Sequence, residues 1–205
     1  MAWTEEAMAE QRQSSGKKIV FLIGDSIREG YCETVRRELA EEADVVYPDE
    51  NCRFSQYILV RLRQWAGMCD PQKVALVHFN CGHWDSAQWS GEEGPLNTPE
   101  QYQENIRRII VCINRIFPNA KVIFATTTPM NPNGANSANP RTTERIIVFN
   151  QAGVKAAEAC GVKVNDLFEF TREWDPSCYL DYCHYTAKHA QILGRHVAEF
   201  IRGEL

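Results

Sequence analysis

The chain has 205 residues, a length that lets one compact domain bury a core without disulfides or a structural metal. Hydrophobic residues make up 44% and charged residues 24% of the chain, which is typical of globular proteins and excludes the disordered and fibrous classes. The net charge of −5 provides no broad basic surface for a polyanion, so we expect no nucleic-acid partner.

The N-terminal residues 1–17 contain no apolar core of a signal peptide, and no later run approaches the roughly 20 apolar residues that a membrane span needs. We therefore expect a soluble, cytoplasmic protein that does not bind membranes. The eight cysteines are then expected to be reduced thiols and not a disulfide framework. We expect one domain over residues 1–205, with residues 1–16 as a poorly ordered or peripheral segment.

Five short apolar runs predict β-strands. They are nearly continuous and do not alternate with polar residues, which is typical of strands buried on both faces of a parallel sheet. The runs cover residues 18–24, 43–47, 74–80, 121–126 and 162–166.

Segments with helical spacing lie between these strands. The clearest covers residues 98–117, where Thr98 can cap the helix and Pro99 suits its first turn. Further apolar stripes predict helices over residues 58–65 and 146–157, and a last helix is expected to begin at Thr186. This alternation of strands and helices predicts an α/β protein, a three-layer α/β/α sandwich around a five-stranded parallel sheet.

The first predicted strand runs directly into Gly24-Asp25-Ser26. The carboxyl edge of a parallel sheet is where α/β proteins bind ligands, so Ser26 is a candidate nucleophile. The same residues also suit an ordinary turn or a helix cap.

A second motif, Asp181-Tyr182-Cys183-His184, precedes the last predicted helix. An aspartate bonded to one ring nitrogen of His184 would leave the other nitrogen to accept a proton from a serine hydroxyl. Asp181 could instead simply cap the helix. Taken with Ser26, the motif favours a Ser-His-Asp triad.

These two motifs resemble the first and last blocks of the SGNH/GDSL hydrolase family, whose fold is flavodoxin-like. The resemblance spans nearly the whole chain, since the segments 117–120, 122–129 and 164–167 also recur at such positions. It implies a serine esterase that needs no cofactor, with Ser26 as nucleophile, His184 as general base and Asp181 as the residue that orients His184.

The second and third blocks depart from the family pattern. The second block usually supplies a glycine amide to the oxyanion hole, whereas residues 50–55 contain no glycine, and the amide of Cys52 is the expected substitute. Cys52 could equally be a buried thiol. The third block usually reads Gly-x-Asn-Asp. Here Asn80 ends the third predicted strand, and we prefer its side chain to His83 as an oxyanion donor.

Other polar and aromatic residues have weaker signals. Trp84 and Trp89 could stack on a sugar ring or cover an edge of the core. Arg28 and Arg53 could bind an anionic group, although a solvated surface arginine is the default expectation.

We expect no metal site. Two sets of residues have suitable ligand types but lack the spacing of known zinc motifs: His78, Cys81 and His83, and Cys178, Cys183 and His184.

Other function classes find less support. Residues 24–28 lack the last glycine of the α/β-hydrolase motif, and no dinucleotide or P-loop motif is present. A non-catalytic binding protein that keeps the fold is the remaining alternative, and the retained triad residues oppose it. The loops over residues 86–97 and 130–141 are polar, so we expect a small-molecule substrate with a short, acetyl-like acyl group on a carbohydrate-like alcohol. A lysophospholipase or thioesterase is the alternative substrate class.

Overall fold

The computed structural model describes residues 16–134 and 138–205, and the five predicted strands form one sheet within them. Every neighbouring pair is parallel, and the strand order is β2-β1-β3-β4-β5. The bounds are β1 Lys18–Ile23, β2 Ala43–Val46, β3 Val74–Asn80, β4 Lys121–Ala125 and β5 Lys163–Asn165. The sheet confirms the predicted strands, with β5 shorter than expected.

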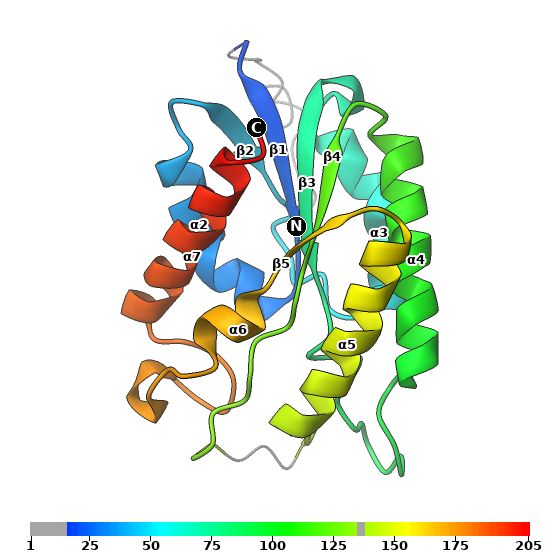
Figure 1. Ribbon diagram of the computed structural model, residues 1–205, viewed down its shortest axis with the longest axis vertical. Helices are drawn as coiled ribbons and strands as arrows, with labels where there is room; N and C mark the ends of the chain where they lie inside the picture. The colour runs from blue at the N-terminus through cyan, green and yellow to red at the C-terminus, as the bar shows by residue number, and fades with distance from the viewer. Residues whose placement is uncertain (1–15, 135–137) are drawn as a thin grey trace.

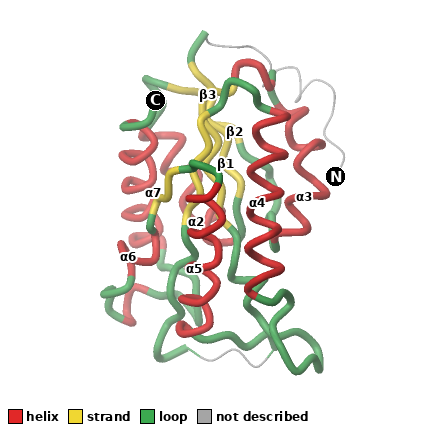
Figure 2. Tube along the Cα trace, turned by 45° about the vertical axis from the view of Figure 1, so that its right-hand side comes forward, coloured by secondary structure: helices red, strands yellow, loops and turns green. Residues whose placement is uncertain are grey.

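Helices cover both faces of the sheet, so the predicted three-layer architecture is confirmed (Figures 1 and 2). One layer holds α2 Ser26–Glu38, α6 Leu167–Thr171 and α7 Ala187–Arg202. The other holds α3 Ser55–Trp65, α4 Pro99–Ile116 and α5 Thr143–Ala159. Short 3-10 turns lie at η1 Ala66–Met68, η2 Pro71–Lys73 and η3 Pro176–Cys178.

The inner strand β1 is anchored from both layers. Its side chains alternate between two cores, with Phe21 and Ile23 facing α3 and α4 and with Val20 and Leu22 facing α2 and α7. All four are fully buried, and full burial of one such side chain contributes about 1.5–3 kcal/mol. The end of β1 is therefore a fixed point from which the following turn is built.

The N-terminus of α4 forms as its sequence predicts. Thr98 is the N-cap, and its side chain and that of Gln101 form a reciprocal capping box, with Pro99 in the first turn. The last helix likewise begins directly after Thr186, as predicted.

Two expectations fall on residues that the structure does not describe. The peripheral segment expected at residues 1–16 lies outside the described residues except for Gly16, and residues 135–137 of the predicted loop after β4 also lie outside them. Among the described helices, none combines the length and the apolar character that crossing a bilayer requires.

The topology determines where a ligand can bind. From β1 the chain moves to β2 on one side and then returns to β3 on the other, so the direction of winding reverses between β1 and β3. In open α/β sheets the crevice at the carboxyl ends of such a strand pair is the usual binding site.

Candidate active site

The turn after β1 places Ser26 at this crevice. Asp25 is the N-cap of α2, and its Oδ1 accepts a hydrogen bond from the Ile27 amide at 3.0 Å. Ser26 is the first helical residue, so its amide has no acceptor within the helix. A Cβ on Gly24 would lie 2.1 Å from Asn80 Oδ1, which explains why only glycine fits there.

Asn80, at the end of β3, braces this turn. Its Nδ2 donates to Asp25 Oδ1 at 3.1 Å, and the Tyr31 hydroxyl donates to its Oδ1 at 3.4 Å. The bond to Asp25 takes one of the two amide hydrogens of Asn80. Burial raises the pKa of Asp25, although the bonds from Ile27 and Asn80 lower it.

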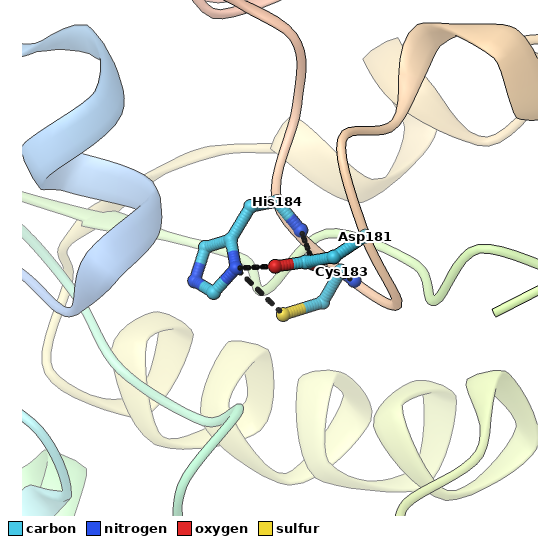
Figure 3. A group of neighbouring side chains, drawn as sticks. All are labelled: Asp181, Cys183 and His184. Atoms are coloured by element: carbon cyan, nitrogen blue, oxygen red, sulfur yellow. Dashed lines mark hydrogen bonds and ion pairs between the residues drawn. The ribbon is translucent and has the colours of Figure 1, made fainter. Parts of the chain in front are cut away.

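The loop before α7 presents Asp181 and His184 together. Asp181 Oδ1 accepts from the amides of Cys183 and His184, both at 2.9 Å, which closes the turn. Asp181 Oδ2 accepts from His184 Nδ1 at 2.7 Å (Figure 3). Burial acts to raise the pKa of Asp181, but these hydrogen bonds outweigh it and the pKa is lowered.

Ser26, from the N-terminal part of the chain, lies beside His184, from the C-terminal part. Its hydroxyl lies 2.7 Å from His184 Nε2, across 158 positions of sequence. Because Asp181 takes the hydrogen on Nδ1, Nε2 is the nitrogen that can accept the serine proton. The structure thus brings together the three residues that the sequence singled out, in the order carboxylate, imidazole and hydroxyl.

The loop after β4 supports the histidine loop. Asn131 donates from its side chain to the Asp181 carbonyl oxygen and from its amide to the Tyr182 carbonyl oxygen, both at 2.9 Å. A Cβ on Gly134 would lie 2.5 Å from Tyr182 Cα. The sequence marked this loop only by its turn-forming composition and gave no sign of these contacts.

The Cys52 amide is not available to donate a hydrogen bond to an oxyanion. It donates to the Gly24 carbonyl oxygen at 3.0 Å, and an amide has only one hydrogen. Cys52 is fully buried, and burial raises the pKa of its thiol to about 11. The next residue, Arg53, has a φ of 53°, in the left-handed region that glycine adopts at least cost, and its amide donates to Asn51 Oδ1 at 2.8 Å. The backbone at Arg53 thus has a conformation typical of glycine, although the residue is an arginine and residues 50–55 contain no glycine.

The default expectation of a solvated side chain is wrong for Arg28, which is only 1% exposed. Its guanidinium donates to the carbonyl oxygens of Gly24, at 3.4 Å, and Glu50. Arg28 therefore ties the Ser26 turn to the loop after β2. Arg53 is exposed, as expected, and lies over the rings of Tyr57 and Trp84, 4.9 and 6.0 Å from their centroids.

His83 is buried beside the site, and Arg141 holds it. Arg141 Nε donates to His83 Nδ1 at 3.3 Å, so the ring hydrogen belongs on Nε2, which donates to Thr128 Oγ1 at 3.2 Å. Burial lowers the pKa of His83 well below its usual value, and the charges of Arg141 and His184 lower it further. His83 is therefore neutral. Sequence reasoning missed Arg141, because it lies far along the chain in a loop without a motif.

A buried carboxylate joins the loops after β2 and β3. Asp85 accepts from the amide and hydroxyl of Ser55 and, at 2.7 Å, from Asn97 Nδ2. Burial raises its pKa to about 6, although these hydrogen bonds lower it. No motif in the sequence indicates this network.

Trp84 and Trp89 stack on each other, with ring centroids 4.9 Å apart and an interplanar angle of 29°. Trp89 Nε1 also donates to the Trp84 carbonyl oxygen at 3.2 Å. Each ring therefore uses one face for the other, which leaves less aromatic surface for a sugar than two separate indoles would offer.

Asp181, Cys183 and His184 also have ligand types that suit a metal, with candidate ligand atoms within 4.8 Å of one another (Figure 3). This group shares Cys183 and His184 with one of the sets considered from the sequence. Asp181 Oδ2 and His184 Nδ1 are bonded to each other, and burial raises the pKa of the Cys183 thiol to about 12, which disfavours the thiolate that a metal needs.

The chain is similar to known proteins in both sequence and fold. The chain is 24% identical to a GDSL esterase/lipase of Arabidopsis thaliana over 201 residues, which cover 90% of this chain and 64% of that protein. It superimposes with a TM-score of 0.72 on the lipase/acylhydrolase of Enterococcus faecalis, at 21% identity over 92% of this chain and 97% of that one. A carbohydrate acetylesterase of Sinorhizobium meliloti gives a TM-score of 0.69 at 13% identity, over 92% and 100% of the two chains.

The chain thus spans 64%, slightly under two thirds, of the length of its Arabidopsis relative, while its fold matches the two solved structures over almost their whole length. The sequence model of the GDSL-like Lipase/Acylhydrolase family matches residues 22–192, which include both ends of the hydrogen-bonded triad. On this match, the chain belongs to the GDSL-like Lipase/Acylhydrolase family.

Proposed function

We propose that the protein is a serine esterase in which Ser26 is the nucleophile, His184 the general base and Asp181 the residue that orients His184. One observation carries this proposal: two hydrogen bonds of 2.7 Å join the three side chains in the order that proton transfer requires. Family membership supports it.

In the proposed reaction, Ser26 Oγ attacks the ester carbonyl carbon as its proton passes to His184 Nε2. The tetrahedral intermediate collapses, and the leaving alcohol takes that proton from His184. Water, activated by the same nitrogen, then releases the acid and regenerates Ser26.

We propose the Ser26 amide and the side chain of Asn80 as oxyanion donors. Both lie at the crevice between β1 and β3, and Asn80 has a second amide hydrogen beyond the one that Asp25 accepts. The loop after β2 can add the Arg53 amide only if the Asn51 side chain rotates away, since Asn51 Oδ1 accepts from that amide at 2.8 Å.

For the substrate we propose an ester with a short, acetyl-like acyl group, and a carbohydrate as the alcohol part. The polar loops that follow β3 and β4 support a short acyl group, because each buried methylene is worth roughly 0.8 kcal/mol only where apolar surface can receive it. The fold likeness to a carbohydrate acetylesterase supports the alcohol part.

A longer acyl chain is the second candidate, and one observation favours it. Leu180 is 74% exposed and directly precedes Asp181 in the chain, so the loop that carries Asp181 and His184 also exposes a large apolar side chain. A lysophospholipase or thioesterase could use it.

The deciding experiment measures kcat/KM for acetyl, butyryl, octanoyl and palmitoyl esters of one chromogenic alcohol, with the wild type and Ser26→Ala in parallel. We expect the acetyl ester to be preferred and Ser26→Ala to be inactive on all four. A maximum at octanoyl or beyond would favour the second candidate, and equal rates for the two proteins would contradict the esterase proposal itself.

A further inference from the structure

We infer that Arg141 binds a carboxylate of the substrate, so that the enzyme prefers esters that carry an anionic group. This inference rests on the proposed esterase function and names the chemical class of its substrate.

Arg141 borders the catalytic residues. It follows β4, and its Nη2 lies 3.5 Å from Cys183 Sγ, which itself lies 3.8 Å from His184 Nδ1. Burial is the main influence on the pKa of Asp25, and Arg141 and His184 are the charges that act against it. The guanidinium therefore shares one electrostatic environment with the base and with the residue beside the nucleophile.

Within the described residues, every group that the Arg141 guanidinium contacts is neutral. Nε donates to the ring of His83, Nη1 to the Asn139 carbonyl oxygen at 3.4 Å and Nη2 to the Cys183 thiol, while the Tyr182 ring lies 5.2 Å from the guanidinium carbon. Such partners hold the side chain in place without neutralising it.

Arg141 takes part in none of the ion pairs formed by the described residues. Other arginines pair with carboxylates there, namely Arg36, Arg37, Arg61, Arg107, Arg172 and Arg202. Five of these six arginines are exposed, whereas Arg61, half-buried like Arg141, pairs with the half-buried Glu50. A partly desolvated cation is stabilised most by an anion, and a ligand in the crevice can supply one.

The guanidinium is also oriented in advance. Buried His83 is kept neutral and holds Nε, while Nη1 and Nη2 each have a second hydrogen beyond the one donated to Asn139 or Cys183, so the guanidinium can still donate to a carboxylate. A site prepared before binding loses less entropy.

The distance from the nucleophile shows where the carboxylate would lie. Arg141 is connected to Ser26 through two other side chains: its Nη2 lies 3.5 Å from Cys183 Sγ, which lies 3.8 Å from His184 Nδ1, and His184 Nε2 lies 2.7 Å from Ser26 Oγ. The anionic group would therefore be several bonds away from the ester carbonyl, in either the acyl group or the alcohol.

The experiment uses matched pairs of probes that differ only in charge. For the alcohol side, 4-acetoxybenzoate is compared with methyl 4-acetoxybenzoate. For the acyl side, 4-nitrophenyl succinate is compared with its methyl ester, each corrected for spontaneous hydrolysis. We expect kcat/KM of the wild type to favour the anionic member of at least one pair by about 10- to 100-fold, as one charge-assisted contact gives, and the preference to shrink in 0.5 M salt.

Arg141→Gln should reduce that ratio at least fivefold, mainly through KM, and Arg141→Lys should have an intermediate ratio. Arg108→Gln, on the exposed side of α4, is the control for the change in net charge and should keep the wild-type ratio. The inference is overturned if neither pair shows a preference, if the ratio survives in Arg141→Gln, or if Arg53→Gln abolishes it instead.

Binding to Ser26→Ala separates this inference from the esterase proposal. Calorimetry should show that this variant binds 4-hydroxybenzoate at least tenfold more tightly than methyl 4-hydroxybenzoate, and that Arg141→Gln, added to it, removes the difference. That result would support the carboxylate site even if no ester were hydrolysed, and equal binding of the two phenols would contradict it even in an active enzyme.

Discussion

Ser26 and His184 reach the same hydrogen bond from two different surroundings. The turn of Ser26 is part of the core: Asp25 is fully buried, Arg28 is nearly so, and Asn80 closes the turn from the neighbouring strand. The loop of His184 lies at the surface, where the side chains of His184 and Asp181 are 31% and 40% exposed.

Because of this difference, substitutions around the nucleophile and around the base should have different effects. The nucleophile is fixed by the same contacts that hold the sheet and α2 together, so changes around it should alter stability and activity together. The base is positioned by a short loop that rests on Asn131, so changes there should alter activity with little effect on stability.

The prediction with the largest expected effect tests whether Ser26 and His184 act in the same reaction. Ser26→Ala and His184→Ala should each lower kcat at least ~10³-fold, because a nucleophile and its base act as a unit. Both side chains are partly exposed, so the thermal midpoint should stay within about 2 °C of the wild type. The double variant should be no worse than either single one, and a further large loss in the double variant would show that the two residues act independently.

Asn80 belongs to the buried side, so its loss should affect both properties. Asn80→Ala should lower kcat about 10²–10³-fold if it is an oxyanion donor, and should cost about 1–3 kcal/mol of stability because Asp25 loses a buried partner. Tyr31→Phe, which removes only the 3.4 Å bond to Asn80, is the matched control. If His83→Ala lowers kcat and Asn80→Ala does not, our interpretation of the third block is wrong.

Two glycines give a direct contrast between the regions. In Gly24→Ala the new Cβ would lie 2.1 Å from Asn80 Oδ1 and 2.6 Å from Arg28 Cβ, so we expect a loss of about 2–3 kcal/mol together with at least tenfold lower activity. In Gly134→Ala the clash is with Tyr182 in an exposed loop, so we expect a several-fold loss of activity and under about 1 kcal/mol of stability. Denaturant unfolding and kcat/KM measure both. Equal stability losses would remove the distinction between the two regions.

The smallest effect concerns the pH dependence of the buried side. Asp85 has a folded-state pKa of about 6, above the ~3.9 of an unfolded aspartate, so its ionised form is disfavoured in the folded protein. Its full penalty is present above pH 6, so the contribution of Asp85 to the free energy of unfolding should become more favourable by about 2–3 kcal/mol as pH falls from 7 to 4. Asp85→Asn should lack this gain when the free energies of unfolding are compared over that range. Parallel curves for the two proteins would show that Asp85 is not the source.

The parts of the fold that depend on local patterns could be predicted from the sequence. The buried strands, the capped start of α4 and the two motifs around Ser26 and His184 all follow from residues close together in the chain. Their meeting at one crevice follows from the parallel sheet, since both motifs come at its carboxyl edge.

The contacts that tune the site could not be predicted in the same way. The burial of Arg28, the acceptor of the Cys52 amide and the neutral partners of Arg141 each depend on how separate loops pack, which no short pattern records. Arg28 shows the difficulty plainly, because an arginine is usually exposed and here fills the space between two loops.

The left-handed backbone at Arg53 sets two energies against each other at one residue. A residue with a Cβ costs roughly 1–2 kcal/mol more than glycine in that conformation, so mutation to glycine would be favoured by backbone energy alone. Arg53→Gly would also lose the contacts of the guanidinium with the Tyr57 and Trp84 rings, each worth about 0.5–1 kcal/mol at an exposed site. The cost of the left-handed backbone is therefore offset by the side chain that bears it.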